Sequence, residues 1–351
     1  MKSWDTIIVG GGIIGLSLAI ALRKQGMRVL IVERGEPGRE ASSAAAGMLV
    51  ASSPELPRQL RPLAAESARL YPEFVHELED ESRTRVDLRE HGTILLAPTD
   101  RLPENAQSLP ASELRKLEPA LAAPGDVSIG YIEERCLDPR ALVAAAIKAA
   151  RHRGVDIASG SEVQRVLLEN GRTCGIESSQ TRYSSPKVVN CAGAWSGCIA
   201  PERLPVRPVK GQMLAVVGGP AIKHVVRAEK VYLVPRGHGR IVIGSTLEEA
   251  GYNKQTDVST IQQLLRRAVE LAPELSRAKK HEDWAGLRPG TPDDLPILGE
   301  TGTRGCFIAS GHYRDGILLA PATAQWMTDA LINQNHAHRL APFSPARFKK
   351  N

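Results

Sequence analysis

The sequence predicts an α/β fold in which a Rossmann-type domain is interrupted by a second, mainly antiparallel β-sheet domain. Two observations predict it: strand and helix patterns alternate near both ends of the chain, and residues 206–246 between them show a succession of short strands. The 351 residues are enough for one large domain or two intertwined ones. We predict that the first domain comprises residues 1–84, 138–204 and 282–351, and that the inserted domain comprises residues 85–137 and 205–281.

The chain begins with a strand, turn, helix and second strand within residues 5–33. The apolar run at residues 6–9 is typical of a buried parallel strand, and Gly10, Gly12 and Gly15 follow it as a G-x-G-x-x-G motif. The first glycine permits the tight turn, the second lets backbone approach a pyrophosphate, and the third lets the helix pack on the sheet. Because a helix N-terminus also attracts phosphate, the unit predicts a dinucleotide site. The alternative is a glycine-rich turn that only packs a helix against a strand.

Glu33 stands at the end of the second strand of this unit. A carboxylate there accepts hydrogen bonds from the two adenosine ribose hydroxyls and repels a 2′-phosphate, which argues against NADP. The sequence has no second copy of the glycine motif, since Gly237 and Gly239 are followed by an unrelated pattern. Flavin enzymes reduced by NAD(P)H commonly carry two dinucleotide sites. The single motif therefore favours a flavin that an organic substrate reduces directly.

Small residues dominate residues 39–48, which follow the second strand. They allow the backbone to lie against a flat or phosphorylated ligand, and Ser42 and Ser43 have hydroxyls that cap a helix or donate to phosphate. An ordinary tight helix start has the same composition. The position just after Glu33 favours the ligand-binding interpretation.

Apolar periodicity predicts the other helices, at residues 60–83, 112–117, 138–154, 256–272 and 317–333. Asp138 and Pro139 give the third of these a cap and a first-turn proline. Apolar or β-branched runs predict strands at residues 92–97, 131–132, 155–157, 162–168, 174–177, 211–217, 231–234 and 239–245. Residues 187–195 predict a buried strand that runs into a glycine turn. Residues 282–320 are dense in Gly and Pro, and we assign no strand to them.

Composition argues against several classes of protein. The net charge is +6, but Lys and Arg are scattered and not interleaved with aromatic residues, so nucleic-acid binding is not indicated. The odd number of cysteines, with no C-x-x-C, indicates neither a disulfide framework nor a zinc site. No apolar run has the length of a membrane helix, and the N-terminal run lacks the basic region of a signal peptide. We therefore expect a reduced, cytoplasmic chain without a metal.

Five stretches together resemble the glycine oxidases, which belong to the D-amino-acid oxidase family of FAD proteins. They are Gly10–Gly15 with Glu33, Ser42–Met48, Tyr232–Arg236, Trp284–Thr291 and Gly311–Pro321. The resemblance spans nearly the whole chain, and the last two stretches are the most specific to that family.

The resemblance implies a p-hydroxybenzoate-hydroxylase-like arrangement with non-covalent FAD bound in extended form. It implies oxidation of glycine, sarcosine and small D-amino acids to imines by hydride transfer to flavin N5. Oxygen then gives hydrogen peroxide, and water hydrolyses the imine to a 2-oxo acid. The resemblance further implies a homo-oligomer, of which the homotetramer is our prediction, and a link to thiamine biosynthesis.

The resemblance also implies the substrate residues. Arg288 would hold the substrate carboxylate, because a planar guanidinium suits a bidentate clamp. Tyr232 would add a hydroxyl to the same carboxylate, and Arg314 would lie beside the substrate at the flavin. Without the resemblance, Arg288 reads as a surface arginine and Tyr232 as a core aromatic residue. Leu247 stands at a position where the family has Met. Leucine is branched and less flexible than methionine, so we expect this difference to affect the range of substrates.

The motif and the resemblance together assign a larger set of residues to FAD. The segment from His312 to Leu318 would wrap the flavin ring with a helix start facing its O2, and Val163 would contact adenine through its backbone. The predicted cofactor-binding residues are Gly10, Gly12, Ile13, Ile14, Gly15, Glu33, Arg34, Ala41, Ser42, Ser43, Ala46, Gly47, Met48, Val163, Ala192, Gly193, His312, Tyr313, Arg314, Asp315, Gly316, Ile317 and Leu318.

Three alternatives remain at the level of sequence. A dehydrogenase of the same fold would oxidise D-amino acids or sarcosine and pass electrons to a membrane quinone. A non-catalytic flavin-binding protein would hold FAD that amino acids do not bleach. An NAD-binding regulator would be colourless. The intact motifs around Arg288 and Arg314 argue against the last two.

Overall fold

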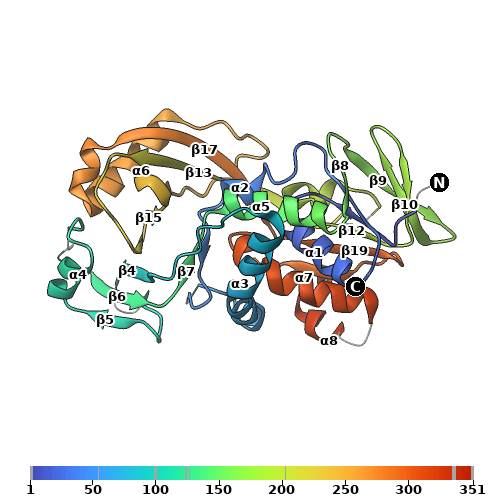
Figure 1. Cartoon of the computed structure of the whole chain (residues 1–351), viewed down its shortest axis with the longest axis horizontal. Helices are drawn as coiled ribbons and strands as arrows, with labels where there is room; N and C mark the ends of the chain where they lie inside the picture. Colours follow the sequence, from blue (N-terminus) through green and yellow to red (C-terminus); the bar gives the residue numbers. More distant parts are fainter. Residues whose placement is uncertain are drawn as a thin grey trace.

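Two large sheets organise the protein, one toward each end of the view in Figure 1. A six-stranded sheet lies on the side of both chain termini, and an eight-stranded sheet lies on the other. This computed structural model describes residues 3–53, 55–98, 101–122, 125, 127–201, 203–333 and 337–348.

The six-stranded sheet has the order β18-β19-β12-β1-β2-β8 and is parallel except for β18. Every residue of β1 and β2 is buried, as expected of parallel strands covered on both faces. The strands are β1 (Thr6–Val9), β2 (Val29–Val32), β8 (Asp156–Ala158), β12 (Val188–Asn190), β18 (Ile297–Glu300) and β19 (Cys306–Ser310).

Different layers cover the two faces of this sheet. Ile8 and Ile31 pack in one apolar cluster with helices α1 (Ile13–Lys24), α3 (Arg61–Ser82), α5 (Pro139–His152) and α7 (Gly316–Ile332). Ile7 and Leu30 face the opposite way, onto a three-stranded sheet of β9 (Val163–Glu169), β10 (Arg172–Ser178) and β11 (Arg182–Ser184). The alternation of neighbouring residues between two cores follows from the two-residue period of a strand.

The predicted helices begin within about two residues of their expected starts, whereas the four-residue helices at 41–44 and 337–340 were not predicted. Asp138 caps α5 by accepting a hydrogen bond from the Arg140 amide at 2.9 Å, with Pro139 in the first turn. Asp257 caps α6 (Val258–Leu271) through the Thr260 amide at 2.8 Å. No helix in the described ranges is both long and apolar enough to cross a membrane.

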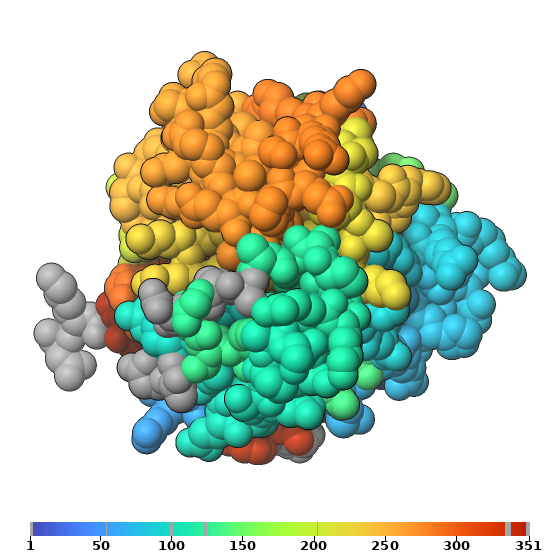
Figure 2. All heavy atoms as spheres, turned by 90° about the vertical axis from the view of Figure 1, so that its left-hand side faces the viewer, coloured from blue at the N-terminus to red at the C-terminus, as the bar shows by residue number. Residues whose placement is uncertain are grey.

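The eight-stranded sheet has the order β17-β13-β16-β15-β14-β4-β6-β5 and is antiparallel except for the β14–β4 pair. Figure 2 views this end, with α6 and β17 above and the segment of β5, β6 and α4 (Ala111–Leu117) below. The strands are β4 (Thr93–Ala97), β5 (Gln107–Leu109), β6 (Ser128–Ile132), β13 (Arg207–Val217), β14 (Val225–Ala228), β15 (Tyr232–Pro235), β16 (Ile241–Gly244) and β17 (Lys279–Gly290).

One face of this sheet covers a closed core, and the other faces the half of the molecule that contains the six-stranded sheet. Leu214 and Leu233 pack against α6 on the closed face. Met213 and Tyr232 lie on the opposite face, in a cluster that includes Ala46 from the segment after β2. Short elements complete the fold: α2 (Ala41–Ala44), β3 (Met48–Leu49) paired with β7 (Arg135–Cys136), and α8 (Ala337–Leu340).

The predicted fold class, a Rossmann-type domain with an inserted, mainly antiparallel sheet, is confirmed. The assignment of residues 282–320 was incomplete, because β17, β18 and β19 all lie within residues 279–310. The proposed domain border at residue 282 falls inside β17, which pairs with β13 along its length. The remaining domain limits stay a prediction.

Candidate active site

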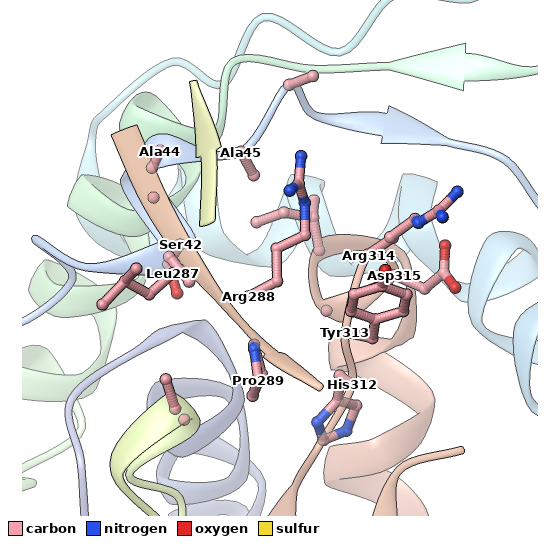
Figure 3. Close-up of a pocket in the computed structure, with 18 of the residues that line it drawn as sticks. Ser42, Ala44, Ala45, Leu287, Arg288, Pro289, His312, Tyr313, Arg314 and Asp315 are labelled. Atoms are coloured by element: carbon pink, nitrogen blue, oxygen red, sulfur yellow. The ribbon is translucent and has the colours of Figure 1, made fainter. Parts of the chain in front are cut away.

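A cavity of about 1460 Å³ is lined by residues from both large sheets. Its walls include the turn after β1, the end of β2, the segment 40–48, the start of α7, and the open faces of β13, β15 and β17. Figure 3 shows part of it, with Arg288 extending from β17 and the segment His312–Asp315 leading into α7.

The glycine motif is shaped by close approaches that only glycine permits. Gly10 has a φ of +107°, and a Cβ on it would lie 2.5 Å from the carbonyl oxygen of Cys191. A Cβ on Gly15 would overlap the carbonyl oxygen of Gly10, so α1 rests directly on the turn. Gly12, at the N-cap of α1, lines the cavity. These are the distinct roles that the motif predicts for its first and third glycines.

The surroundings of this turn fit a dinucleotide. The N-cap of α1 makes no side-chain hydrogen bond and its first turn has no acid, which leaves a helix end suited to an anion. The Ile13 amide donates to Ser42 Oγ at 2.9 Å, which places that hydroxyl at the helix end. Glu33 lines the cavity and accepts from the amides of Gly11 at 2.8 Å and Gly35 at 3.0 Å, which orients its carboxylate. Its remaining lone pairs suit ribose hydroxyls.

The predicted cofactor residues largely converge on the cavity, but three do not line it. Gly15 packs beneath the turn, Leu318 is fully buried on α7, and Ser43 turns away to donate to the Gly38 carbonyl. Those on its wall are Gly10, Gly12, Ile13, Ile14, Glu33, Arg34, Ala41, Ser42, Ala46, Gly47, Met48, Val163, Ala192, Gly193, His312, Tyr313, Arg314, Asp315, Gly316 and Ile317.

The segment before α7 brings polar groups to the cavity without supplying an evident base. His312 is buried, its Nε2 lies 3.1 Å from Thr323 Oγ1, and burial lowers its pKa to about 3, so the imidazole is neutral. Tyr313 has a φ of +47° and its amide donates to the Pro289 carbonyl at 3.0 Å. Asp315 is the N-cap of α7, and burial raises its pKa to about 6.

Arg288 projects from β17 into the cavity (Figure 3), and its side chain is mostly buried. Its Nη2 donates to Ser245 Oγ at 2.8 Å, and its Nη1 donates to the carbonyl oxygens of Thr246 at 3.2 Å and Lys210 at 3.3 Å. None of the ion pairs in the described part of the chain involves Arg288. Burial lowers its pKa from the usual arginine value, but a guanidinium remains charged in proteins. The cavity thus contains a cation held by neutral acceptors.

Tyr232 projects from β15 toward the same guanidinium. Its hydroxyl lies 3.6 Å from Met213 Sδ, and its ring covers Gly244, where a Cβ would come within 2.6 Å of the hydroxyl oxygen. Burial raises the pKa of Tyr232, so the hydroxyl stays protonated and able to donate a hydrogen bond.

Two further predicted substrate residues lie in more open positions. Arg314 lines the cavity, with its guanidinium 3.4 Å from Glu55 Oε2 and 5.1 Å from the centre of the Tyr313 ring. Leu247 also lines the cavity, and 52% of its surface is exposed. The structure therefore brings Arg288 and Tyr232 together and places Arg314 and Leu247 on the wall around them.

Sequence reasoning missed the residues that hold Arg288. Ser245 and Thr246 accept its hydrogen bonds, and Gly211 leaves the space that its guanidinium fills. The one available signal was a glycine inside a predicted strand, which marks a close approach. Lys210 is buried, its Nζ lies 3.6 Å from Glu248 Oε2, and its backbone carbonyl accepts from Arg288.

Comparison with known proteins places this site in a family. The family described as FAD dependent oxidoreductase matches residues 5–330. Glycine oxidase from Bacillus licheniformis is 35% identical over 349 residues, which cover 94% of each chain. The crystal structure of glycine oxidase from Geobacillus kaustophilus is 34% identical, covers both chains completely and superimposes with a TM-score of 0.94.

A bifunctional ThiO/ThiG protein from Trichormus variabilis is 36% identical over 99% of this chain, which spans only about half (55%) of that longer relative. The family match covers far more than half of the present chain, and FAD is the dinucleotide that accords with the glycine motif and the Glu33 carboxylate. The chain belongs to the family of FAD-dependent oxidoreductases.

Proposed function

We propose that this enzyme catalyses the oxidative deamination of glycine, sarcosine and small D-amino acids, with reduction of O2 to H2O2. The observation that carries the proposal is the buried Arg288 guanidinium, which has neutral hydrogen-bond acceptors and no carboxylate partner in the described ranges. A substrate carboxylate supplies the missing negative charge. Such a charge-assisted, bidentate contact is what arginine forms best with carboxylates.

The proposed reaction converts an amino acid R–NH–CHR′–COO⁻, O2 and H2O into R–NH2, the 2-oxo acid R′–CO–COO⁻ and H2O2, where R′ is hydrogen for glycine and sarcosine. FAD, which the residues around the glycine motif and Glu33 would hold, would supply the two-electron acceptor for oxidation of the carbon between the amine and the carboxylate. The chain's own contribution is binding and orientation: Arg288 fixes the carboxylate, and the protonated Tyr232 hydroxyl adds a donor to it. Water then hydrolyses the imine.

No side chain is assigned the role of general base. His312 is neutral but its Nε2 is taken up by Thr323, which leaves it in a structural position. The substrate amine is proposed to bind in its neutral form, so loss of hydride needs no further proton acceptor at the carbon. Leu247, on the cavity wall, is proposed to tune which side chains and N-substituents are accepted.

The experiment that tests this proposal is an anaerobic visible spectrum of the purified protein during titration with glycine, sarcosine and D-alanine. Air is then admitted and peroxide is assayed. A flavin that bleaches with an amine and returns in air with one equivalent of peroxide supports the oxidase. Bleaching followed by slow return without peroxide would replace it with the dehydrogenase. A flavin that no amine bleaches would reject both.

We also propose a role in thiamine biosynthesis, which the glycine oxidase resemblance implies and the similarity to the bifunctional ThiO/ThiG protein supports. The same resemblance is the basis for proposing a homo-oligomer, a homotetramer in the first instance, whereas the cytoplasmic location is proposed from the odd number of cysteines without a C-x-x-C motif. Size-exclusion chromatography with light scattering tests the assembly.

A further inference from the structure

Among the arginines on the cavity wall in the described residues, Arg227 stands apart because its guanidinium donates no hydrogen bond. The side chain of Arg227, on β14, is 25% exposed, and none of its five N–H groups donates a hydrogen bond within the described residues. Its nearest acid is Glu134, with Oε2 at 3.9 Å from Nη1. Three other wall arginines have closer carboxylates, namely Arg34 with Glu40 at 2.9 Å, Arg101 with Glu229 at 3.1 Å and Arg314 with Glu55 at 3.4 Å, and Arg288 donates to neutral oxygens.

Strand register places Arg227 beside the proposed substrate residues. Arg227 is directly opposite Tyr232 in the antiparallel β14–β15 pair, and Tyr232 is opposite Gly244 in β15–β16. Side chains of directly opposed residues lie on the same face of a sheet as close neighbours. Tyr232 therefore lies between Arg227 on β14 and Gly244 on β16, and Arg288 reaches from β17 to Ser245, the residue after Gly244.

Glu134 is the acid nearest to the Arg227 guanidinium, but it accepts no hydrogen bond from the N–H groups of that guanidinium. The 3.9 Å separation exceeds a hydrogen bond, and Glu134 Oε2 is itself buried without a hydrogen-bond partner. Glu134 Oε1 is already occupied by the Ser52 hydroxyl at 2.8 Å. Asp315, at the start of α7, acts on Arg227 only through longer-range attraction. A largely buried guanidinium with free donors that faces a cavity is suited to an anionic oxygen of a ligand.

We propose that Arg227 forms a second carboxylate subsite, and that the substrates include amines with a second acidic group on the nitrogen or the side chain. N-carboxymethylglycine and D-aspartate are representatives of this class. This inference rests on the proposed function, because Arg288 takes the first carboxylate. The second carboxylate then extends past Tyr232 to Arg227, and the reaction at the carbon beside the amine is unchanged.

A matched pair of unreactive ligands tests the subsite on the FAD-loaded protein. Methoxyacetate replaces the sarcosine nitrogen by oxygen, and diglycolate adds one carboxylate to the same skeleton. Isothermal titration calorimetry of the wild type is expected to show diglycolate binding at least about tenfold more tightly, the scale of one charge-assisted hydrogen bond. Arg227→Gln is expected to remove this preference and to leave methoxyacetate affinity within about twofold.

Two variants serve as controls. Arg101→Gln removes a wall cation that Glu229 already pairs, and it is expected to preserve the preference for diglycolate. Arg227→Lys keeps a charge and is expected to recover part of the preference. In steady-state kinetics, Arg227→Gln is expected to lower kcat/KM for N-carboxymethylglycine about tenfold while that for sarcosine changes little.

Three results would overturn the subsite. The wild type binds methoxyacetate and diglycolate with equal affinity; or Arg227→Gln weakens the binding of both ligands equally; or Arg101→Gln removes the preference for diglycolate as completely as Arg227→Gln does. If the wild type oxidises sarcosine but shows no preference for diglycolate, only the subsite proposal is rejected. If no amine reduces the flavin, but the protein prefers diglycolate and this preference depends on Arg227, the proposed reaction is rejected and the second carboxylate site is retained.

Discussion

At the scale of single residues, Arg288 is the most informative position. We predict that Arg288→Ala raises the KM for glycine on the order of 100-fold, the cost of losing one member of a buried charged pair, while FAD stays bound. Arg288→Lys should recover only part of the loss, because a point charge does not clamp a carboxylate bidentately. Steady-state peroxide production and the flavin spectrum of each variant measure both effects. Wild-type kinetics in Arg288→Ala would contradict the site.

Gly211 supplies a second prediction at this scale. A Cβ on Gly211 would overlap the Arg288 guanidinium, so Gly211→Ala must displace it from Ser245 and Thr246. We expect a raised KM for glycine, about tenfold, with FAD affinity unchanged. The matched control is Gly237→Ala, where a Cβ would meet only Asp87 Oδ2 at 3.9 Å. Equal kinetics in the two variants would mean that the position of the guanidinium does not govern substrate binding.

At the scale of elements, the start of α7 carries a pH-dependent prediction. Burial raises the pKa of Asp315 from 3.8 to about 6, so the folded state holds this proton more tightly than the unfolded state. Ionisation of Asp315 therefore destabilises the folded state. This loss of stability grows as the pH rises from about 4 to 6 and is complete above pH 6. Asp315→Asn, which keeps the size and also caps helices, should raise the Tm at pH 7.5 and leave it nearly unchanged at pH 4. A pH-independent difference in thermal melts would contradict this.

The elements also show what sequence patterns predict well. The unit from β1 to β2 could be predicted because its signals are local: a buried apolar run forms the strand, the glycines permit the turn, and an acid follows the second strand. The strand β17 escaped prediction because Gly286, Pro289 and Gly290 lower its strand propensity. Pairing with β13 over its whole length overrides that propensity. A Cβ on Gly286 would come within 2.6 Å of Ala44 Cβ, so the glycine that lowers the strand propensity also allows β17 to pack closely against α2.

At the scale of the whole molecule, the site depends on contacts that local sequence does not encode. The glycine motif and Glu33 were predicted from spacing, whereas Arg288 and Tyr232 came only from resemblance to a family. Arg288 and Ser245 meet because β13 lies between β17 and β16. The position of Arg227 beside Tyr232 could not be predicted for the same reason, since it follows only from strand register.

The two halves of the molecule are joined by a charged network, and the last prediction concerns it. Glu282 on β17 lies 2.8 Å from Arg140 of α5 and 3.5 Å from Arg240, which in turn lies 3.0 Å from Asp138 at the start of α5. Glu282→Gln leaves two partly buried arginines less well compensated. We expect a Tm lower by about 2 °C, since shared, half-buried charges contribute more than isolated surface pairs.

The matched control for this prediction is Glu177→Gln, which breaks pairs with the exposed Arg165 and Arg182 within the β9–β11 sheet and spans no boundary. Its Tm should change by less than about 1 °C. Because the Glu282 network connects α5 with the eight-stranded sheet, its loss should also speed flavin release, measured as the recovery of free-flavin fluorescence during slow heating. Identical melts and release rates for the two variants would show that this network does not couple the halves, and that the shared FAD cavity and the apolar contacts around Ala46 hold them together instead.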